Sequence, residues 1–163
     1  QALKARHPEV WVSVSATTRP PRPTEVDGVH YHFVSNADFD VLVATDGLLE
    51  WATVHGRDRY GTPSAPVEAA VERGERVILE IDLQGARQVR QRLPGARLVF
   101  IAPPNWAELV NRLVGRGTET AEQRERRLRT AQVELAAADE FDHVVVNDDL
   151  GRAVDDLVSL LGL

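Results

Sequence analysis

The sequence contains no cysteine, no methionine and no long apolar run. Without cysteine there can be no disulfide bond, no thiolate ligand for a metal and no cysteine nucleophile. No apolar stretch reaches the roughly 18 residues that a membrane-spanning helix needs, and the first residues do not resemble a signal peptide. We therefore expect a cytoplasmic protein that has no membrane partner.

The composition is that of one globular domain, since 43% of the 163 residues are hydrophobic and 27% are charged. The net charge of −6 and the pI near 5.4 argue against a surface that binds duplex nucleic acid. Of the 19 basic residues only Lys4 is lysine, so the chain is rich in planar guanidinium groups that bind oxyanions bidentately. The missing methionine and the start at Gln1 suggest that residues upstream are absent.

Apolar segments alternate with helical patterns, which is typical of an α/β fold with a parallel sheet and flanking helices. Residues 77–81, 98–101 and 144–146 are almost continuously apolar, as expected for strands that helices cover on both faces. Helical periodicity follows each of these segments.

One region interrupts this alternation. Residues 30–34 and 48–54 are strand-like, and a short helical segment near residues 38–44 lies between them. We interpret residues 30–60 as a small mixed insert beside the main sheet.

The segment from Ser15 to Arg22 follows an apolar strand predicted over residues 11–14. Ligands in open α/β sheets bind at the carboxyl ends of strands, and Arg19 and Arg22 lie there on a loop that prolines restrict. These guanidinium groups are candidates for a phosphate clamp. The alternative is a solvated proline-rich turn.

A second candidate is Glu50, which is surrounded in sequence by Leu48, Leu49 and Ala52. A carboxylate beside so much apolar surface needs a partner, because an unpaired buried charge is costly. Guanine offers two adjacent donors to one carboxylate, whereas adenine presents an acceptor at N1. Glu50 could therefore select guanine, unless it is an exposed strand residue.

A third candidate pair is Glu80 and Asp82, at the end of an apolar strand that enters a helix. Residues two apart share a strand face, so the pair could organise hydrated Mg²⁺ or contact a sugar or base. Helix capping by Asp82 is the alternative.

Arginines also cluster around residues 115–120. Guanidinium groups delivered by a mobile segment stabilise the charge of a transferred phosphoryl group. The candidates are Arg112, Arg116 and Arg127, although such a run is also typical of a solvated helix face. His30 and His32 share a strand face, but no third ligand with suitable spacing supports a zinc site.

The order and wording of these motifs resemble guanylate kinase from about Trp11 to the C-terminus. The matching segments are SVSATTRPPR, EVDGVHYHFV, LLEW, RYGT, VILEIDLQGA, FIAPP, RLVGRGTET, RRLRTAQVEL and HVVVNDD. The resemblance implies a P-loop nucleoside-monophosphate kinase fold, with a parallel core sheet, a GMP-binding insert and a mobile lid. It implies the reversible transfer of the γ-phosphoryl group of ATP to GMP, and to dGMP, with Mg²⁺.

The resemblance also assigns roles to individual residues. It implies that the GMP phosphate is bound by Arg19, Arg22, Tyr31 and Tyr60, and that guanine is contacted by Ser15, Glu50, Thr62 and Asp82. The lid arginines with a catalytic role correspond to Arg112, Arg116 and Arg127, and the ATP contacts to Arg116 and Asn147. The metal role is not part of the resemblance: the carboxylate pattern described above predicts that Glu80 and Asp82 bind Mg²⁺ through water.

The resemblance divides the chain into a core of residues 1–29, 63–111 and 131–163, an insert of residues 30–62 and a lid of residues 112–130. The family's phosphate-binding loop, G-x-x-x-x-G-K-[ST], is not among the 163 residues. We expect it within some 20 residues upstream of Gln1, as part of a central strand and the following loop. Without it, phosphoryl transfer is not expected.

Two other classes of function are alternatives to the enzyme interpretation. A non-catalytic guanylate-kinase-like module would bind phosphorylated peptides, but such modules are expected to have lost parts of the GMP site that this chain retains. Nucleic-acid binding through the arginines is disfavoured by the acidic charge balance. The sequence leaves the oligomeric state open.

Overall fold

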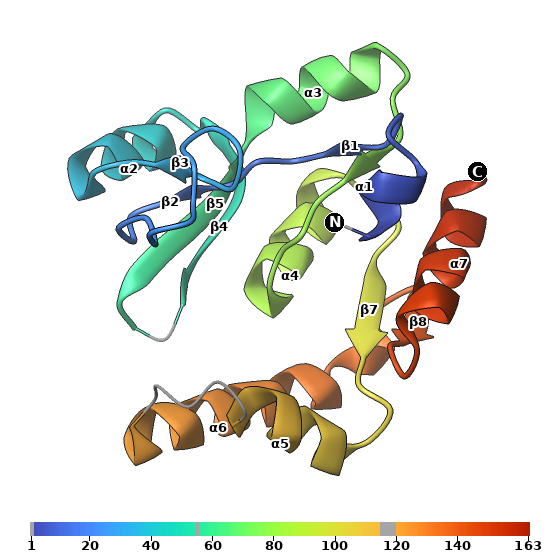
Figure 1. Ribbon diagram of the computed structural model, residues 1–163. Helices are drawn as coiled ribbons and strands as arrows, with labels where there is room; N and C mark the ends of the chain where they lie inside the picture. The colour runs from blue at the N-terminus through green and yellow to red at the C-terminus, as the bar shows by residue number, and fades with distance from the viewer. Residues whose placement is uncertain (1, 55, 115–119) are drawn as a thin grey trace. The chain divides into compact units, whose positions relative to one another are not determined.

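The computed structural model describes residues 2–54, 56–114 and 120–163. The chain forms two compact units, Leu3–Ala96 and Arg97–Leu163. Each unit combines helices with strands (Figure 1), so the predicted α/β class is confirmed. Within the described ranges, no helix has both the length and the apolar character required to cross a membrane.

The first unit carries most of the strands. Its elements are α1 (Ala2–Arg6), β1 (Trp11–Val12), β2 (Ala16–Thr17), β3 (His32–Phe33), α2 (Asn36–Ala44), β4 (Leu48–Val54), β5 (Asp58–Pro63), α3 (Ser64–Glu72), β6 (Val77–Ile78) and α4 (Leu83–Arg92). The second unit is mainly helical. Its elements are β7 (Val99–Ala102), α5 (Trp106–Val114), α6 (Ala121–Ala136), the 3₁₀ helix η1 (Ala138–Glu140), β8 (His143–Val146) and α7 (Leu150–Leu161).

The strands of the described residues form three sheets. The parallel strands pair as β1 with β6 and as β7 with β8, where the sequence predicts a single core sheet. Each of these pairs lies within one compact unit. The third sheet has the order β3-β2-β5-β4 and contains both parallel and antiparallel pairs.

This four-stranded sheet is the small mixed element predicted for residues 30–60, with one strand added. Strand β2 lies outside that range and joins because the N–H groups of His32 and Val34 donate to the carbonyls of Ser15 and Thr17. Ala16, Phe39 and Leu48 form the buried cluster beneath it. The division into core, insert and lid stays a prediction.

Strand β6 is shorter than predicted, because it ends at Ile78 rather than at residue 81. The pairing with β1 ends at the hydrogen bond from the N–H of Ser13 to the carbonyl of Ile78. Beyond Ser13 the chain continues into β2, which belongs to the four-stranded sheet. Glu80 and Asp82 therefore lie beyond the strand. The prediction that they share a strand face is wrong.

Local capping fixes two of the helices that frame the site. Ser35 and Asp38 form a reciprocal capping box at the start of α2. Asp82 caps α4, since its Oδ1 accepts from the N–H of Gly85 at 2.8 Å. The helix-capping interpretation of Asp82 is thus confirmed.

Candidate functional site

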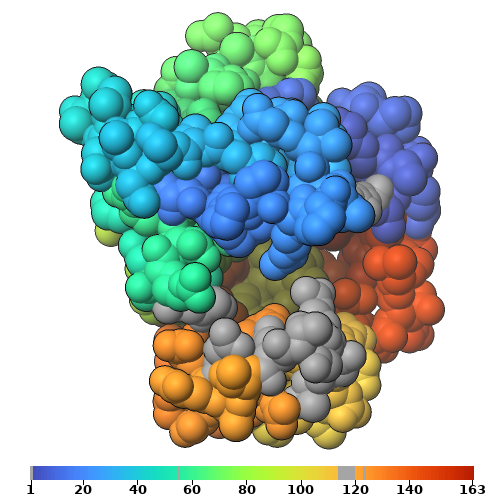
Figure 2. Space-filling model, turned by 60° about the vertical axis from the view of Figure 1, so that its left-hand side comes forward, coloured from blue at the N-terminus to red at the C-terminus, as the bar shows by residue number. Residues whose placement is uncertain are grey.

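The loop that follows β2 carries the two predicted phosphate-binding arginines. Figure 2 shows the segment that contains it (blue) on the face in view. Arg19 is largely buried, with 13% of its side chain exposed, whereas Arg22 is 66% exposed. The two guanidinium groups therefore differ: Arg19 is part of the packed structure, and Arg22 faces solvent.

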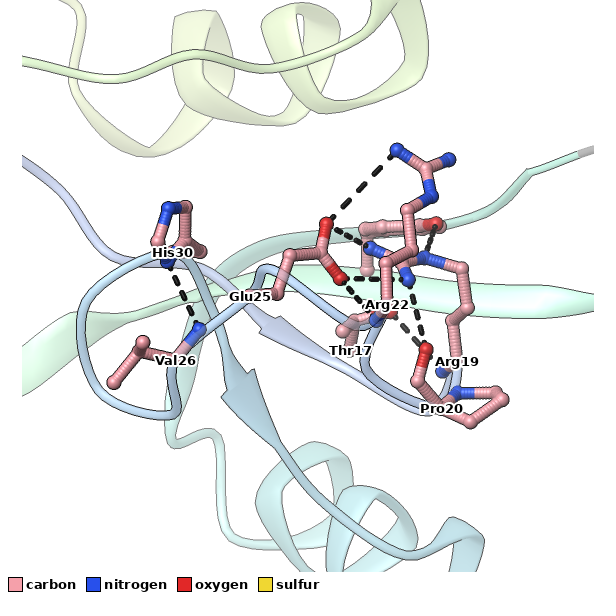
Figure 3. A network of polar contacts seen from close by, with 8 residues as sticks. Thr17, Arg19, Pro20, Arg22, Glu25, Val26 and His30 are labelled. Atoms are coloured by element: carbon pink, nitrogen blue, oxygen red, sulfur yellow. Dashed lines mark hydrogen bonds and ion pairs between the residues drawn. The ribbon is translucent and has the colours of Figure 1, made fainter.

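A carboxylate that the sequence analysis did not single out holds this loop together. Glu25 accepts from both terminal nitrogens of Arg19, at 3.0 and 2.9 Å, and from the backbone N–H of Arg22 at 2.7 Å. Figure 3 shows Glu25 pointing toward both arginines. Bidentate pairing of this kind fixes the plane of the guanidinium group. The signal in the sequence is an acidic residue placed after the prolines that turn the loop back on itself.

The hydrogen bonds from Arg19 lower the pKa of Glu25 to about 2, and the same pair raises the pKa of Arg19. A carboxyl group with a lowered pKa stabilises the fold above its unfolded pKa, and that contribution is lost as the pH falls through the folded value.

Replacing Glu25 with Gln is therefore expected to lower the melting temperature at neutral pH, because the ion pair with Arg19 is lost. The difference between wild type and variant should shrink as the pH falls from about 4.5 toward 2. Thermal unfolding followed by circular dichroism across this range measures it. A difference that does not change with pH would contradict the assigned pairing.

Two tyrosines complete this part of the site. The Nε–H of Arg19 donates to the hydroxyl of Tyr60 at 3.2 Å, and its guanidinium carbon lies 5.5 Å from the ring centroid of Tyr31. The rings of Tyr31 and Tyr60 meet edge to face with centroids 5.8 Å apart. Burial raises the pKa of the Tyr31 hydroxyl, so it stays a hydrogen-bond donor at neutral pH. The structure thus brings together Arg19, Arg22, Tyr31 and Tyr60.

Glu50 is not an exposed strand residue, because only 5% of it is accessible. Leu48, Leu49 and Glu50 are buried in succession, and the register of β4 shifts between Leu48 and Glu50. A bulge of this kind breaks the usual alternation at Leu49, while Glu50 and Ala52 keep the inward side of the regular strand. Glu50 accepts at Oε1 from the hydroxyl of the fully buried Thr62, 2.6 Å away on the paired strand β5.

The carboxyl of Glu50 has a raised pKa, first because burial disfavours its charged form and further because Asp82 adds a negative charge nearby. The hydrogen bond from Thr62 acts in the opposite direction without cancelling the effect. Buried carboxyl groups with raised pKa values cluster at functional sites.

This raised pKa makes a stability prediction for Glu50→Gln. The fold raises the pKa of Glu50, so ionisation of this carboxyl opposes folding once the pH rises above the ordinary glutamate pKa of 4.5. The melting temperature of the variant should increase relative to wild type as the pH rises from 4 to 7. Thermal unfolding at several pH values tests this prediction. The same difference in melting temperature between variant and wild type at pH 4 and at pH 7 would be evidence against a buried ionised Glu50.

The other predicted site residues of the first unit are Ser15, Glu80 and Asp82. Asp82 is close enough to Glu50 to raise its pKa, and Glu80 has a smaller effect of the same sign on Tyr31. Ser15 uses its carbonyl to pair with β3. Among the residues that the structure describes, no three acidic or histidine side chains form a cluster that could enclose a metal ion. The nitrogen Nδ1 of His30 accepts from the N–H of Val26.

Four residues of the second half of the chain are predicted to act in catalysis or to contact ATP, and the structure joins two of them, Arg112 and Asn147. Arg112, on α5, donates to the carboxylate of Glu108 at 2.9 Å and to the carbonyl of Asn147 at 3.1 Å. Asn147 in turn donates through its N–H to Ala102. Arg127 lies half-buried on α6, which packs against α5. Arg116 lies outside the described residues.

Comparison with known proteins gives one consistent family. The family model described as guanylate kinase matches residues 1–162. A guanylate kinase of Cutibacterium acnes is 63% identical over 162 residues, which are 99% of this chain and 81% of that protein. A guanylate kinase of Nocardia farcinica is 57% identical over 161 residues, or 98% of this chain and 83% of that protein.

A solved structure agrees with these sequences. The crystal structure of guanylate kinase from Anaplasma phagocytophilum superposes with a TM-score of 0.81 at 30% sequence identity. The match covers 99% of this chain and 80% of the other.

Proposed function

The chain belongs to the guanylate kinase family, and from this premise we propose that it serves the reversible transfer of the γ-phosphoryl group of ATP to GMP, and to dGMP, giving ADP and the guanosine diphosphate. The four-stranded sheet and the arginine loop would hold the acceptor nucleotide. The helices α5 and α6 would carry the lid arginines. The parallel pairs β1–β6 and β7–β8 are of the kind expected in the core of a P-loop kinase.

The buried carboxylate of Glu50 carries this proposal. Thr62 occupies Oε1 as a donor, which fixes the carboxylate plane on the sheet. A carboxylate held in this way accepts from the N1–H and the 2-amino group of guanine. Adenine would place its N1 lone pair against the same oxygens, so the site favours GMP over AMP.

The arginine loop supports binding of the acceptor phosphate. Arg22 offers an exposed guanidinium beside the bidentate pair of Arg19 and Glu25. The hydroxyls of Tyr31 and Tyr60 add neutral donors that need no counter-ion. A phosphate dianion there would gain charge-assisted hydrogen bonds in a loop that is already ordered, so little entropy is lost on binding.

Catalysis would depend on positioning and charge neutralisation, because in-line attack by a GMP phosphate oxygen needs no covalent enzyme intermediate. Arg112, Arg116 and Arg127 would stabilise charge on the transferred group, with Arg116 and Asn147 also contacting ATP. Glu80 and Asp82 would hold Mg²⁺ through water, with Oδ1 of Asp82 also accepting from the N–H of Gly85. When bound with ATP, Mg²⁺ neutralises charge on the phosphates.

The direct test is GMP-dependent formation of ADP from Mg-ATP by the full-length protein, followed in a coupled assay with GMP, dGMP or AMP as acceptor. We expect activity with GMP and dGMP and none with AMP at the same concentration. Absence of turnover with GMP, together with binding of a phosphopeptide, would instead identify a non-catalytic module of the same fold.

A further inference from the structure

One face of α4 is fastened to strand β4 by side chains that bind backbone atoms. The amide of Gln88 accepts from the N–H of Trp51 at 3.1 Å and donates to its carbonyl at 2.7 Å. Four residues later, Arg92 donates to the carbonyl of Leu48 at 2.8 Å and to Asp46 at 2.6 Å. These contacts fix the separation of the helix and the strand.

Gly85 lies three residues before Gln88, on the same face of α4. A Cβ on Gly85 would collide with Oε2 of Glu50, and it would lie 3.0 Å from the carboxyl carbon and 3.2 Å from the Cβ of Ile81. The φ of Gly85 does not lie in the left-handed region, so backbone conformation does not require glycine here. Glycine is also a poor helix former. What the residue provides is therefore space for the carboxylate.

The carboxylate cannot easily move elsewhere. Its other oxygen is held by Thr62, and Gln88 and Arg92 prevent the helix from moving back. We propose that Gly85 is a specificity-determining positioning residue, which seats the Glu50 carboxylate where it reads the base of the acceptor nucleotide. This inference rests on the proposed function, since it names what sets the geometry of that site.

The test compares Gly85→Ala with Gly95→Ala, because a Cβ at Gly95 meets nothing within 4 Å. Calorimetry on the full chain measures the affinity for GMP and for IMP, whose base has the N1–H but not the 2-amino group. Gly85→Ala should weaken GMP binding about tenfold to a hundredfold, the effect of losing one hydrogen bond to a charged group. IMP binding should weaken less, so the preference for GMP over IMP should fall.

Gly95→Ala should bind both nucleotides like wild type. A merely structural effect at Gly85 would weaken both ligands equally, and that result would overturn the proposal. If wild type itself does not bind GMP, the proposed function fails instead, which distinguishes the two failures.

A second measurement needs no nucleotide. In the Glu50→Ala background the collision with the carboxylate disappears and only the 3.2 Å approach to the Cβ of Ile81 remains, so Gly85→Ala should change the melting temperature little. With Glu50 present, the same substitution should lower the melting temperature. If the two backgrounds respond identically, the contact between Gly85 and Glu50 does not constrain the carboxylate, and the proposal is wrong.

Discussion

Replacing Glu50 with Gln is expected to lower kcat/KM for GMP about tenfold to a hundredfold, because one charge-assisted hydrogen bond to guanine is lost. The amide still accepts at its oxygen, but its NH₂ group faces a donor of the base. Adenine presents an acceptor at N1, so the preference for GMP over AMP should decrease as well. The retained contact with Thr62 should keep the side chain on the sheet.

The matched control is Glu68→Gln, which makes the same change at an exposed position of α3. It should leave both acceptors unaffected. Steady-state kinetics with GMP and AMP measure the two ratios. If Glu50→Gln keeps the wild-type preference, Glu50 does not determine specificity.

The second large effect is expected for Arg19→Lys. Lysine keeps the charge but cannot make the bidentate pair with Glu25 while also donating to Tyr60. The loop that carries the proposed phosphate ligands should lose its fixed geometry. We expect the KM for GMP to rise about tenfold to a hundredfold.

A nucleoside provides the discriminating control for this variant, because guanosine has the base of GMP without its phosphate. Arg19→Lys should weaken GMP binding and leave guanosine binding unchanged. Arg73→Lys, at an arginine that is half exposed and pairs with Glu75, should change neither. An equal loss of guanosine binding would show that Arg19 supports the fold of the whole site rather than the phosphate.

The sequence predicts helices and strands well where the residues of the segment itself carry the signal. The sequence predicts a strand over residues 48–54, and β4 has these bounds in the structure. The helix predicted near residues 38–44 is α2, which a local capping box at Ser35 and Asp38 begins. Asn105 caps α5 in the same local way, since its side chain accepts from the N–H of Glu108 three residues later.

The predictions that fail depend on a partner elsewhere in the chain. Strand β6 is as apolar as predicted, yet its length is set by where β1 turns away to join another sheet. Glu50 resembles an ordinary strand residue in the sequence, and its burial depends on the paired strand β5 and on the close approach of Gly85 in α4. No periodicity rule contains such information, because these partners meet Glu50 only when the chain folds.

The candidate site was predictable as a set of residue types but not as an arrangement. Arg19 and Arg22 are recognisable from the motif, but the role of Glu25 depends on a loop that brings a carboxylate back onto both arginines. Gly85 gives no signal in the sequence, because its proposed role depends on the Cβ that it lacks and on the position of Glu50 on a different element.

The most direct test of the central claim is a calorimetric titration of the unaltered protein with GMP and, separately, with AMP. The claim is that a buried carboxylate on β4 and an ordered arginine loop together select a guanine nucleotide. It predicts one-to-one binding of GMP with AMP bound at least about a hundredfold more weakly, as expected when a buried hydrogen-bonding group is left without its partner. Equal affinity for the two nucleotides, or no binding of GMP, would contradict it.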